Sequence, residues 1–169
     1  MPGLGSSGPS HWQSLWEQRY RLQRVEQEDW AHPNRSSWVK RLEAVLEEEP
    51  EPVVLVAHSL GCALVAHAAK RAHGKIGAAL LVAPADVEDG ERTPEETRSF
   101  APLPMKPLGF RATVVASRDD PYVAFERAAH FADRWDAAFV DAGAAGHLNA
   151  ESNLGEWPEG YRLLQDLCR

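Results

Sequence analysis

The sequence predicts a three-layer α/β fold in which a mostly parallel, doubly wound sheet is covered by helices on both faces. From residue 53 onward, apolar runs of strand length alternate with helical patterns. Such alternation is typical of right-handed crossovers in a parallel sheet. The runs are rich in Val, Leu and Ala and lack alternating polar residues, as expected for strands that are buried on both faces.

The expected elements can be placed in order along the chain. HWQSLWEQRY (11–20) and SSWVKRLEAVLEEE (36–49) have helical patterns, and a short strand is possible between them at LQRVEQ (22–27). The later elements are expected to be a strand at 53–58, a helix at 60–73, strands at 78–83 and 113–117, a helix at 123–135, a strand at 137–142 and a closing helix at 159–168. The segment 86–110 is rich in Pro, Gly and charge and is expected to be a functional or mobile loop.

Composition bounds the class of protein. The chain has 169 residues, of which 44% are hydrophobic, so we expect one α/β domain spanning residues 1–169. The net charge of -7 offers no basic surface for nucleic acid. No apolar run approaches the roughly 20 residues of a membrane span, and no leader pattern opens the chain. We therefore expect a cytoplasmic protein, with Cys62 and Cys168 as reduced thiols.

The stretch AHSLG (57–61) places Ser59 between an expected buried strand and an expected helix. A nucleophile elbow needs a sharp strand-to-helix turn with small flanking residues, so that the serine hydroxyl stands above the sheet. Ala57 replaces the usual first glycine and is also small. The alternative is that Ser59 only caps the helix, which is a frequent role of serine at such a boundary.

A nucleophilic serine needs a base and an orienting carboxylate, and the chain supplies both in the order Ser, Asp, His. Asp119 and Asp120 follow the strand at 113–117, and His147 follows the strand at 137–142. Taken separately, the aspartates could be turn residues before Pro121, and the histidine a surface residue. Their joint placement at successive strand ends favours a catalytic triad, for which we choose Asp120 and keep Asp119 as the fallback.

Cofactor and metal sites are not expected. GLGSSG (3–8) matches GxGxxG, with Glu28 and Asp29 about twenty positions on, but only Met1 and Pro2 stand where a dinucleotide site needs a strand. The histidines outside the proposed triad lack zinc-ligand spacing. Those weighed as zinc ligands are His58, His67, His73 and His130.

Several stretches together resemble the small serine hydrolases of the YdeN and retinoblastoma-binding-protein-9 family, in the α/β-hydrolase superfamily. They are HWQSLW, VAHSLG, LLVAPAD, VVASRDDPY and GHLNAESNLGEWPEG. The resemblance covers nearly the whole chain and implies a domain without a large cap and a triad of Ser59, Asp120 and His147. It also implies that residues 2–12 form a loop over the nucleophile. Because that family begins with an apolar strand before this loop, we expect the first strand to be missing or truncated.

The same geometry suggests an oxyanion hole and a pocket. The N–H of Leu60, directly after the nucleophile, should be one donor, and the loop at residues 3–5 should supply the second. Leu4 is our choice for it, although its neighbours stay open. Trp12 and Trp157 are candidates for the wall of a substrate pocket.

The predicted activity is acyl transfer to water from a small ester or other acyl substrate, without cofactor. The rival interpretation is a hydrolase-fold protein that mainly binds a protein partner and has weak or no catalysis. Neither nucleic acid nor a membrane is expected as a partner. Dinucleotide binding is a third and weaker interpretation.

Overall fold

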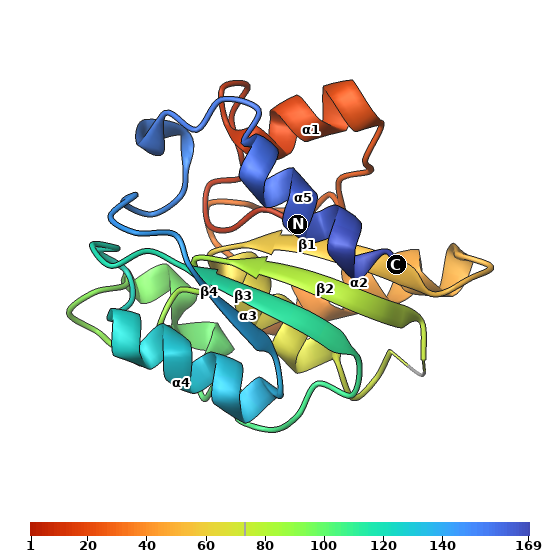
Figure 1. Cartoon of the computed structure of the whole chain (residues 1–169). Coiled ribbons are helices and arrows are strands. Elements are labelled where there is room, and N and C mark those ends of the chain that lie inside the picture. The colour runs from red at the N-terminus through yellow and green to blue at the C-terminus, as the bar shows by residue number, and fades with distance from the viewer. Residues whose placement is uncertain (73) are drawn as a thin grey trace.

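A parallel sheet divides the structure into layers (Figure 1). The computed structural model describes residues 1–72 and 74–169. The elements are α1 (Trp12–Tyr20), α2 (Arg35–Glu48), β1 (Val53–His58), α3 (Leu60–Ala68), β2 (Ile76–Val82), the 3-10 helix η1 (Glu95–Phe100), β3 (Arg111–Ala116), α4 (Phe125–Trp135), β4 (Ala138–Asp141), the 3-10 helix η2 (Ala150–Ser152) and α5 (Pro158–Leu167).

The sheet has the order β1-β2-β3-β4, and each neighbouring pair is parallel. Ala57 of β1 pairs with Leu81 of β2, and Leu81 is in register with Val114 of β3. Because all strands run in one direction, the loops that follow them gather at one end of the sheet. The residues after β1, β3 and β4 are therefore brought together although they are far apart in the sequence.

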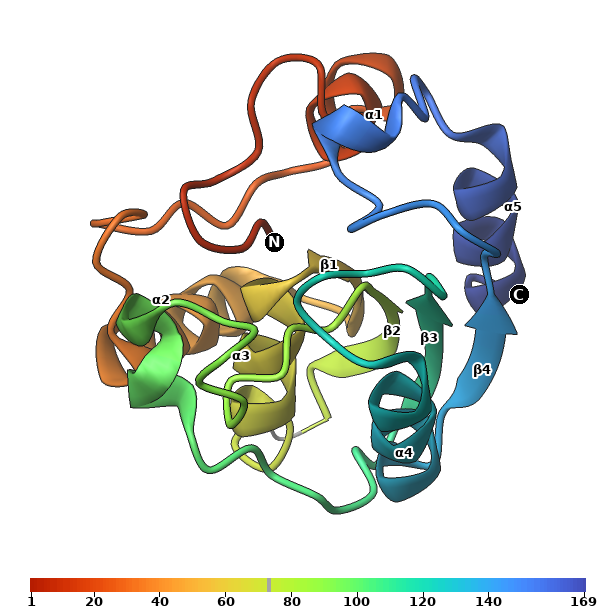
Figure 2. The same cartoon turned by 90° about the vertical axis from the view of Figure 1, so that its left-hand side faces the viewer.

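The two faces of the sheet belong to two hydrophobic clusters. Ala79 and Leu81 of β2 pack with residues of α2, α3 and α4, whereas Leu80 and Val82 pack with residues of α1 and α5. Figures 1 and 2 show α1 and α5 on one side of the sheet and α3 and α4 on the other. Since side chains alternate between the faces of a strand, this division confirms the predicted three-layer α/β fold. In the described residues, no helix is long and apolar enough to cross a bilayer.

Two expected elements differ from the structure. Residues 22–27 contain no strand. The side chain of Arg24 in this segment bonds to Glu17 and Ser14 of α1. The segment is therefore attached to α1 by a side chain and not to the sheet by backbone hydrogen bonds. The helix expected at 60–73 ends at Ala68 and continues as turns, and its expected last residue, His73, lies outside the described residues.

The segment 86–110 is more ordered than its composition indicates. It contains η1, and the guanidinium of Arg98 donates hydrogen bonds to the main-chain oxygens of Val87, Asp89 and Thr93. Arg98 thus links several turns of a segment that forms no strand.

The N-terminal residue pairs with the edge of β1. The Met1 amine donates to Val56 O at 2.7 Å, and the His58 N–H donates to Met1 O at 3.0 Å. A residue in a parallel strand opposite Ala57 would make these same two backbone hydrogen bonds. A hollow of about 500 Å³ continues along β1 from Met1 and borders Val53 and neighbouring residues. In the described chain, Met1 therefore pairs with the edge of β1 where the resembling family has its first strand.

Gly61 gives a test of this packing. A Cβ at Gly61 would lie 2.5 Å from Met1 O and 2.8 Å from Pro2 O, so backbone atoms would have to move. Although Gly→Ala in a helix normally stabilises by about 0.5–1 kcal/mol, we expect Gly61→Ala to lower the free energy of unfolding by about 1–3 kcal/mol through overpacking. Denaturant unfolding measures it. Gly8→Ala is the control, because nothing lies within 4 Å of its Cβ. A Gly61→Ala protein as stable as the wild type would contradict the contact.

Candidate active site

Ser59 occupies a strained turn between β1 and α3. Its φ is 55° and its ψ is -122°, a conformation that non-glycine residues rarely adopt and that costs about 1–3 kcal/mol. The Ser59 N–H donates to Val82 O at 3.0 Å, which ties the turn to β2. The hydroxyl makes no capping hydrogen bond with α3. The capping interpretation therefore does not account for Ser59, whereas the geometry is that of a nucleophile elbow.

Asp120 and His147 meet across the loops that follow β3 and β4. His147 Nδ1 lies 3.0 Å from Asp120 Oδ1 and 2.9 Å from Asp120 Oδ2, and both side chains are buried. The Tyr122 N–H also donates to Asp120 Oδ1 at 2.8 Å, which fixes the carboxylate. Because a carboxylate oxygen accepts hydrogen bonds, His147 Nδ1 is the donor in this contact, and Nε2 is the ring nitrogen turned away from Asp120.

Asp119 faces a different set of groups. Its Oδ1 accepts hydrogen bonds from Ser117 Oγ at 2.7 Å and from the Gly146 N–H at 2.8 Å. The hydrogen bond from Ser117 has the largest effect in lowering the pKa of the Asp119 carboxyl, and the bond from Gly146 adds to it. Asp119 thus fastens the loop that carries His147, and Asp120 is the aspartate that the structure brings to the imidazole.

The loop around His147 is tightly bent and anchored to α1. Gly146 and Leu148, on either side of His147, have φ values of 58° and 49°. The indole Nε1–H of Trp12 donates to Leu148 O at 2.7 Å, and the Leu148 side chain is buried. The helix on one face of the sheet therefore holds the chain directly after the histidine.

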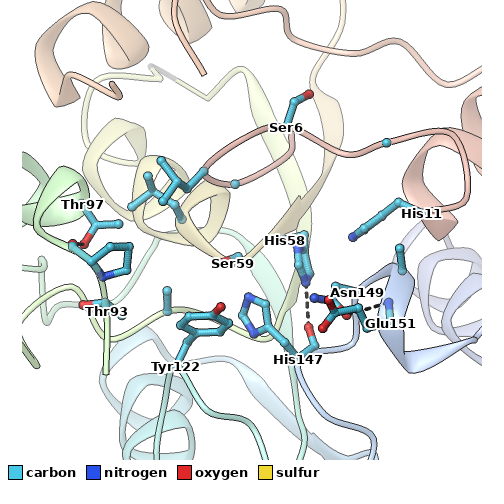
Figure 3. A pocket seen from close by; sticks show the side chains of 17 residues that line it. Ser6, His11, His58, Ser59, Thr93, Thr97, Tyr122, His147, Asn149 and Glu151 are labelled. Atoms are coloured by element: carbon cyan, nitrogen blue, oxygen red, sulfur yellow. Dashed lines mark hydrogen bonds between the residues drawn. The ribbon is translucent and has the colours of Figure 1, made fainter. Parts of the chain in front are cut away.

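Ser59 and His147 line the same cavity, which has a volume of about 320 Å³. Figure 3 shows the imidazole of His147 between Tyr122 and His58, on the side of the cavity where Ser59 lies. The rest of the wall comes from the N-terminal loop, from the segment around η1 and from η2. This agrees in part with the expectation for the segment 86–110, because Thr93, Pro94 and Thr97 lie in the wall.

Trp12 and Trp157 do not form a wall of this cavity, which corrects our expectation. Trp12 is 1% exposed and Trp157 is 6% exposed, and both pack with Trp16 in the cluster beneath α1 and α5. Of the described Trp, Tyr and Phe side chains, Tyr122 lines the cavity; it is 37% exposed and lies edge-on to His147 at 4.5 Å between ring centroids. Its position directly after Asp120 and Pro121 was the available signal in the sequence.

The N-terminal glycine loop packs directly on Ser59. A Cβ at Gly3 would lie 2.9 Å from Ser59 Cβ and 3.1 Å from Leu60 N, so only glycine allows this approach. Leu4 and Leu60 both line the cavity. The N–H groups of Gly5 and Ser6 already donate to main-chain oxygens, which favours Leu4 over these two as a donor toward the cavity.

The described residues hold no group of three or more His, Cys, Asp or Glu side chains that could bind a metal ion. The glycine loop makes its contacts with Ser59 and Leu60, and Gly3 lies beside the strand-to-helix turn rather than after a strand of its own. The glycine at position 3 is therefore explained without a dinucleotide.

Two buried histidines that line the cavity, His11 and His58, were not placed there by sequence reasoning. His11 Nδ1 accepts a hydrogen bond from the Gln13 N–H at 3.1 Å and caps α1, whereas its Nε2 has no hydrogen-bond partner among the described residues. Burial lowers the pKa of His11 to about 4 and lowers the pKa of His58 well below 6.5. Both rings are therefore neutral near pH 7. The position of His58 directly before Ser59 was the only sequence signal for either.

The family follows from comparison with known proteins. A family model described as serine hydrolase matches residues 1–166. The chain belongs to this serine hydrolase family. No curated protein sequence matches it.

Solved structures place this serine hydrolase among YdeN-like proteins with the α/β-hydrolase fold. A putative YdeN-like hydrolase from Pectobacterium atrosepticum is 34% identical, with a TM-score of 0.87, over 98% of this chain and 86% of that one. The ydeN gene product of B. subtilis is 21% identical, with a TM-score of 0.75, over 98% of this chain and 95% of that one. Mouse alpha/beta hydrolase domain-containing protein 10 is 17% identical, with a TM-score of 0.68, over 99% and 85% of the two chains. The last two likenesses concern the fold alone.

Burial of His11 predicts that acid destabilises the serine hydrolase. Below pH 6.5 the unfolded chain binds a proton at His11, while the folded chain does so only near pH 4, so stability falls as the pH falls. Between pH 7.5 and pH 5 this group should remove about 2 kcal/mol from the free energy of unfolding. His11→Asn keeps a capping side chain for α1 but cannot titrate. The free energy of unfolding of this variant should therefore fall by about 2 kcal/mol less than that of the wild type between pH 7.5 and pH 5.

Urea unfolding at both pH values measures this difference. His130→Asn, which removes an exposed histidine on α4, is the control and should retain the wild-type pH dependence. Equal pH dependence in the wild type and His11→Asn would show that His11 is not held neutral by burial.

Proposed function

We propose that this serine hydrolase cleaves an ester or another acyl bond through an acyl-enzyme on Ser59, with His147 as base and Asp120 as the orienting acid. The observation that carries the proposal is the buried His147–Asp120 pair, of which His147 lines the same cavity as Ser59 in its strained turn. A carboxylate on Nδ1 selects the imidazole tautomer whose Nε2 can accept the serine proton.

In the proposed reaction, Ser59 Oγ attacks the acyl carbonyl while its proton passes to His147 Nε2. The tetrahedral intermediate then expels the leaving group, which takes that proton, and the acyl group stays on Oγ. A water molecule then attacks the acyl carbonyl while His147 takes its proton, and Ser59 Oγ leaves with that proton as the acid is released. Asp120 stabilises the imidazolium in both halves without itself becoming protonated.

The oxyanion of the tetrahedral intermediate would be held by backbone N–H groups. Leu60 begins α3, so its N–H is one of those without a partner inside the helix. The second donor in this proposal is Leu4, from the loop that Gly3 brings against Ser59. Each such donor is worth about 3–4 kcal/mol of transition-state stabilisation.

The cavity supports a small substrate without negative charge. Among the described residues that line it, Glu151 has the only carboxylate, and there is no lysine or arginine. His11 and His58 also lack charge near pH 7 because burial lowers the pKa of each. A neutral short-chain ester fits these walls better than a phosphate or a carboxylate, which would meet no compensating cation.

The rival proposal of a protein that mainly binds a partner would need a contact surface apart from this cavity. The exposed large apolar side chains of the described residues are Tyr122 and Phe139, and Tyr122 belongs to the cavity. One exposed Phe139 is not a patch of the size that marks an interface. The arrangement therefore favours the enzyme.

Covalent labelling tests the nucleophile. A fluorophosphonate should add once to the wild-type protein, and Ser59→Ala should abolish the adduct and lower the hydrolysis of p-nitrophenyl acetate by roughly 10³-fold or more. Intact mass detects the adduct, and circular dichroism checks that the variant is folded. An adduct that persists in folded Ser59→Ala would refute Ser59 as the nucleophile.

Paired substitutions separate the two aspartates. Asp120→Asn should lower kcat by roughly 10²- to 10⁴-fold, because an amide can donate to Nδ1 and thereby favour the wrong tautomer. Asp119→Asn can still accept from Ser117 and Gly146 through its amide oxygen, so we expect only a few-fold change in kcat. Steady-state kinetics with p-nitrophenyl acetate measure both. A larger loss in Asp119→Asn than in Asp120→Asn would assign the acid to Asp119.

A further inference from the structure

His58 is a buried imidazole next to the nucleophile that the proposed reaction does not use. It is the last residue of β1 and is 5% exposed. Its Nε2 lies 2.8 Å from the main-chain oxygen of His147, and Figure 3 draws this hydrogen bond across the cavity wall. The bond joins the residue before Ser59 to the residue that carries the proposed base.

The direction of this hydrogen bond follows from its partners. A main-chain carbonyl only accepts, so His58 Nε2 must carry the proton and donate. Burial keeps the ring neutral by lowering the pKa of His58, and a neutral imidazole has only one N–H. That single proton is therefore committed to His147 O, and Nδ1 of His58 carries none.

Packing holds the His58 ring in this orientation. The His11 ring lies edge-on to it at 4.8 Å between centroids, and the His147 ring lies tilted to it at the same centroid distance. Trp12 adds a third aromatic contact at 6.1 Å. With neighbours on several sides, the ring has little freedom to turn its N–H away from the carbonyl.

The His147 residue is thus held from two directions. Its ring is oriented by Asp120, from the loop after β3, whereas its own carbonyl is held from β1 by His58. Asp119, which also follows β3, acts one residue earlier through the Gly146 N–H. Of these contacts, only the one with His58 comes from the strand that leads directly into Ser59.

We propose that His58 is a positioning residue, whose Nε2–H···O=C bond to His147 sets the distance between the base and the nucleophile. The inference rests on the proposed function, since it assigns a role within that same site. His58 does not touch the reacting atoms in this scheme. It acts because proton transfer from Ser59 to His147 is sensitive to displacements of about 1 Å, which can cost about 100-fold in rate.

Three substitutions distinguish the hydrogen bond from the mere filling of space. His58→Phe keeps an aromatic ring but has no donor. His58→Gln places an amide nitrogen the same number of bonds from Cα as imidazole Nε2, so its N–H₂ can reach His147 O. His58→Asn carries the same amide one bond short, so it is the matched control for Gln.

We expect His58→Phe and His58→Asn to lower kcat for p-nitrophenyl acetate by roughly 10- to 100-fold, with KM changed less than about threefold. His58→Gln should recover most of kcat. The rate of fluorophosphonate labelling should follow the same order. Thermal unfolding of each variant separates a loss of fold from a loss of positioning, and the Asn/Gln pair keeps the comparison valid if Phe does not fold.

The outcomes separate this inference from the proposed function. If the wild type is not labelled, or folded Ser59→Ala still is, the proposed function fails whatever His58 does. If labelling depends on Ser59 but folded His58→Asn and His58→Phe retain wild-type kcat, the positioning role is overturned. Folded His58→Gln with activity as low as folded His58→Asn also overturns it, because the donor would then not be what matters.

Discussion

The candidate site depends on the way β1 ends. Ser59 holds a left-handed φ that costs free energy, and such strain persists only where surrounding contacts fix it. The contacts are those of the adjoining backbone: His58 N–H bonds to Met1 O, and Ser59 N–H bonds to Val82 O. Gly61 lets the N-terminal segment lie against the first turn of α3. The strained backbone of Ser59 is thus held by hydrogen bonds from the chain on both sides of β1.

Burial determines the charge of the groups around this turn. His11 and His58 lie where solvation of an imidazolium is poor, so the lowered pKa of each keeps it neutral and limited to a single N–H. Asp120 is buried as well, but it accepts from His147 and from the Tyr122 N–H. Of these three imidazoles in the described chain, His147 is therefore the one that is hydrogen-bonded to a carboxylate.

The sheet fixes where the loops begin, and side-chain hydrogen bonds fix the loops that form the candidate site. The loops after β3 and β4 would be free at their tips, yet Asp119 bonds to the Gly146 N–H and Trp12 bonds to Leu148 O. These contacts join elements more than twenty residues apart, so they tighten the loops without adding regular structure. The indole N–H of Trp12 bonds to the loop at Leu148, and its ring packs in the core. This explains why Trp12 does not line the cavity.

Apart from the absent strand at 22–27 and the shorter helix α3, the sequence by itself determined the elements and the order of the chemical groups, because hydrophobic periodicity and small residues around Ser59 are local properties. It could not separate Asp119 from Asp120, since both precede Pro121 and only the geometry after β3 directs one of them to His147. Nor could it place Trp12 in the core or show the contact between His58 and His147. Those outcomes depend on contacts between segments far apart in the chain, and the tertiary structure decides them because packing fixes which polar groups are buried face to face.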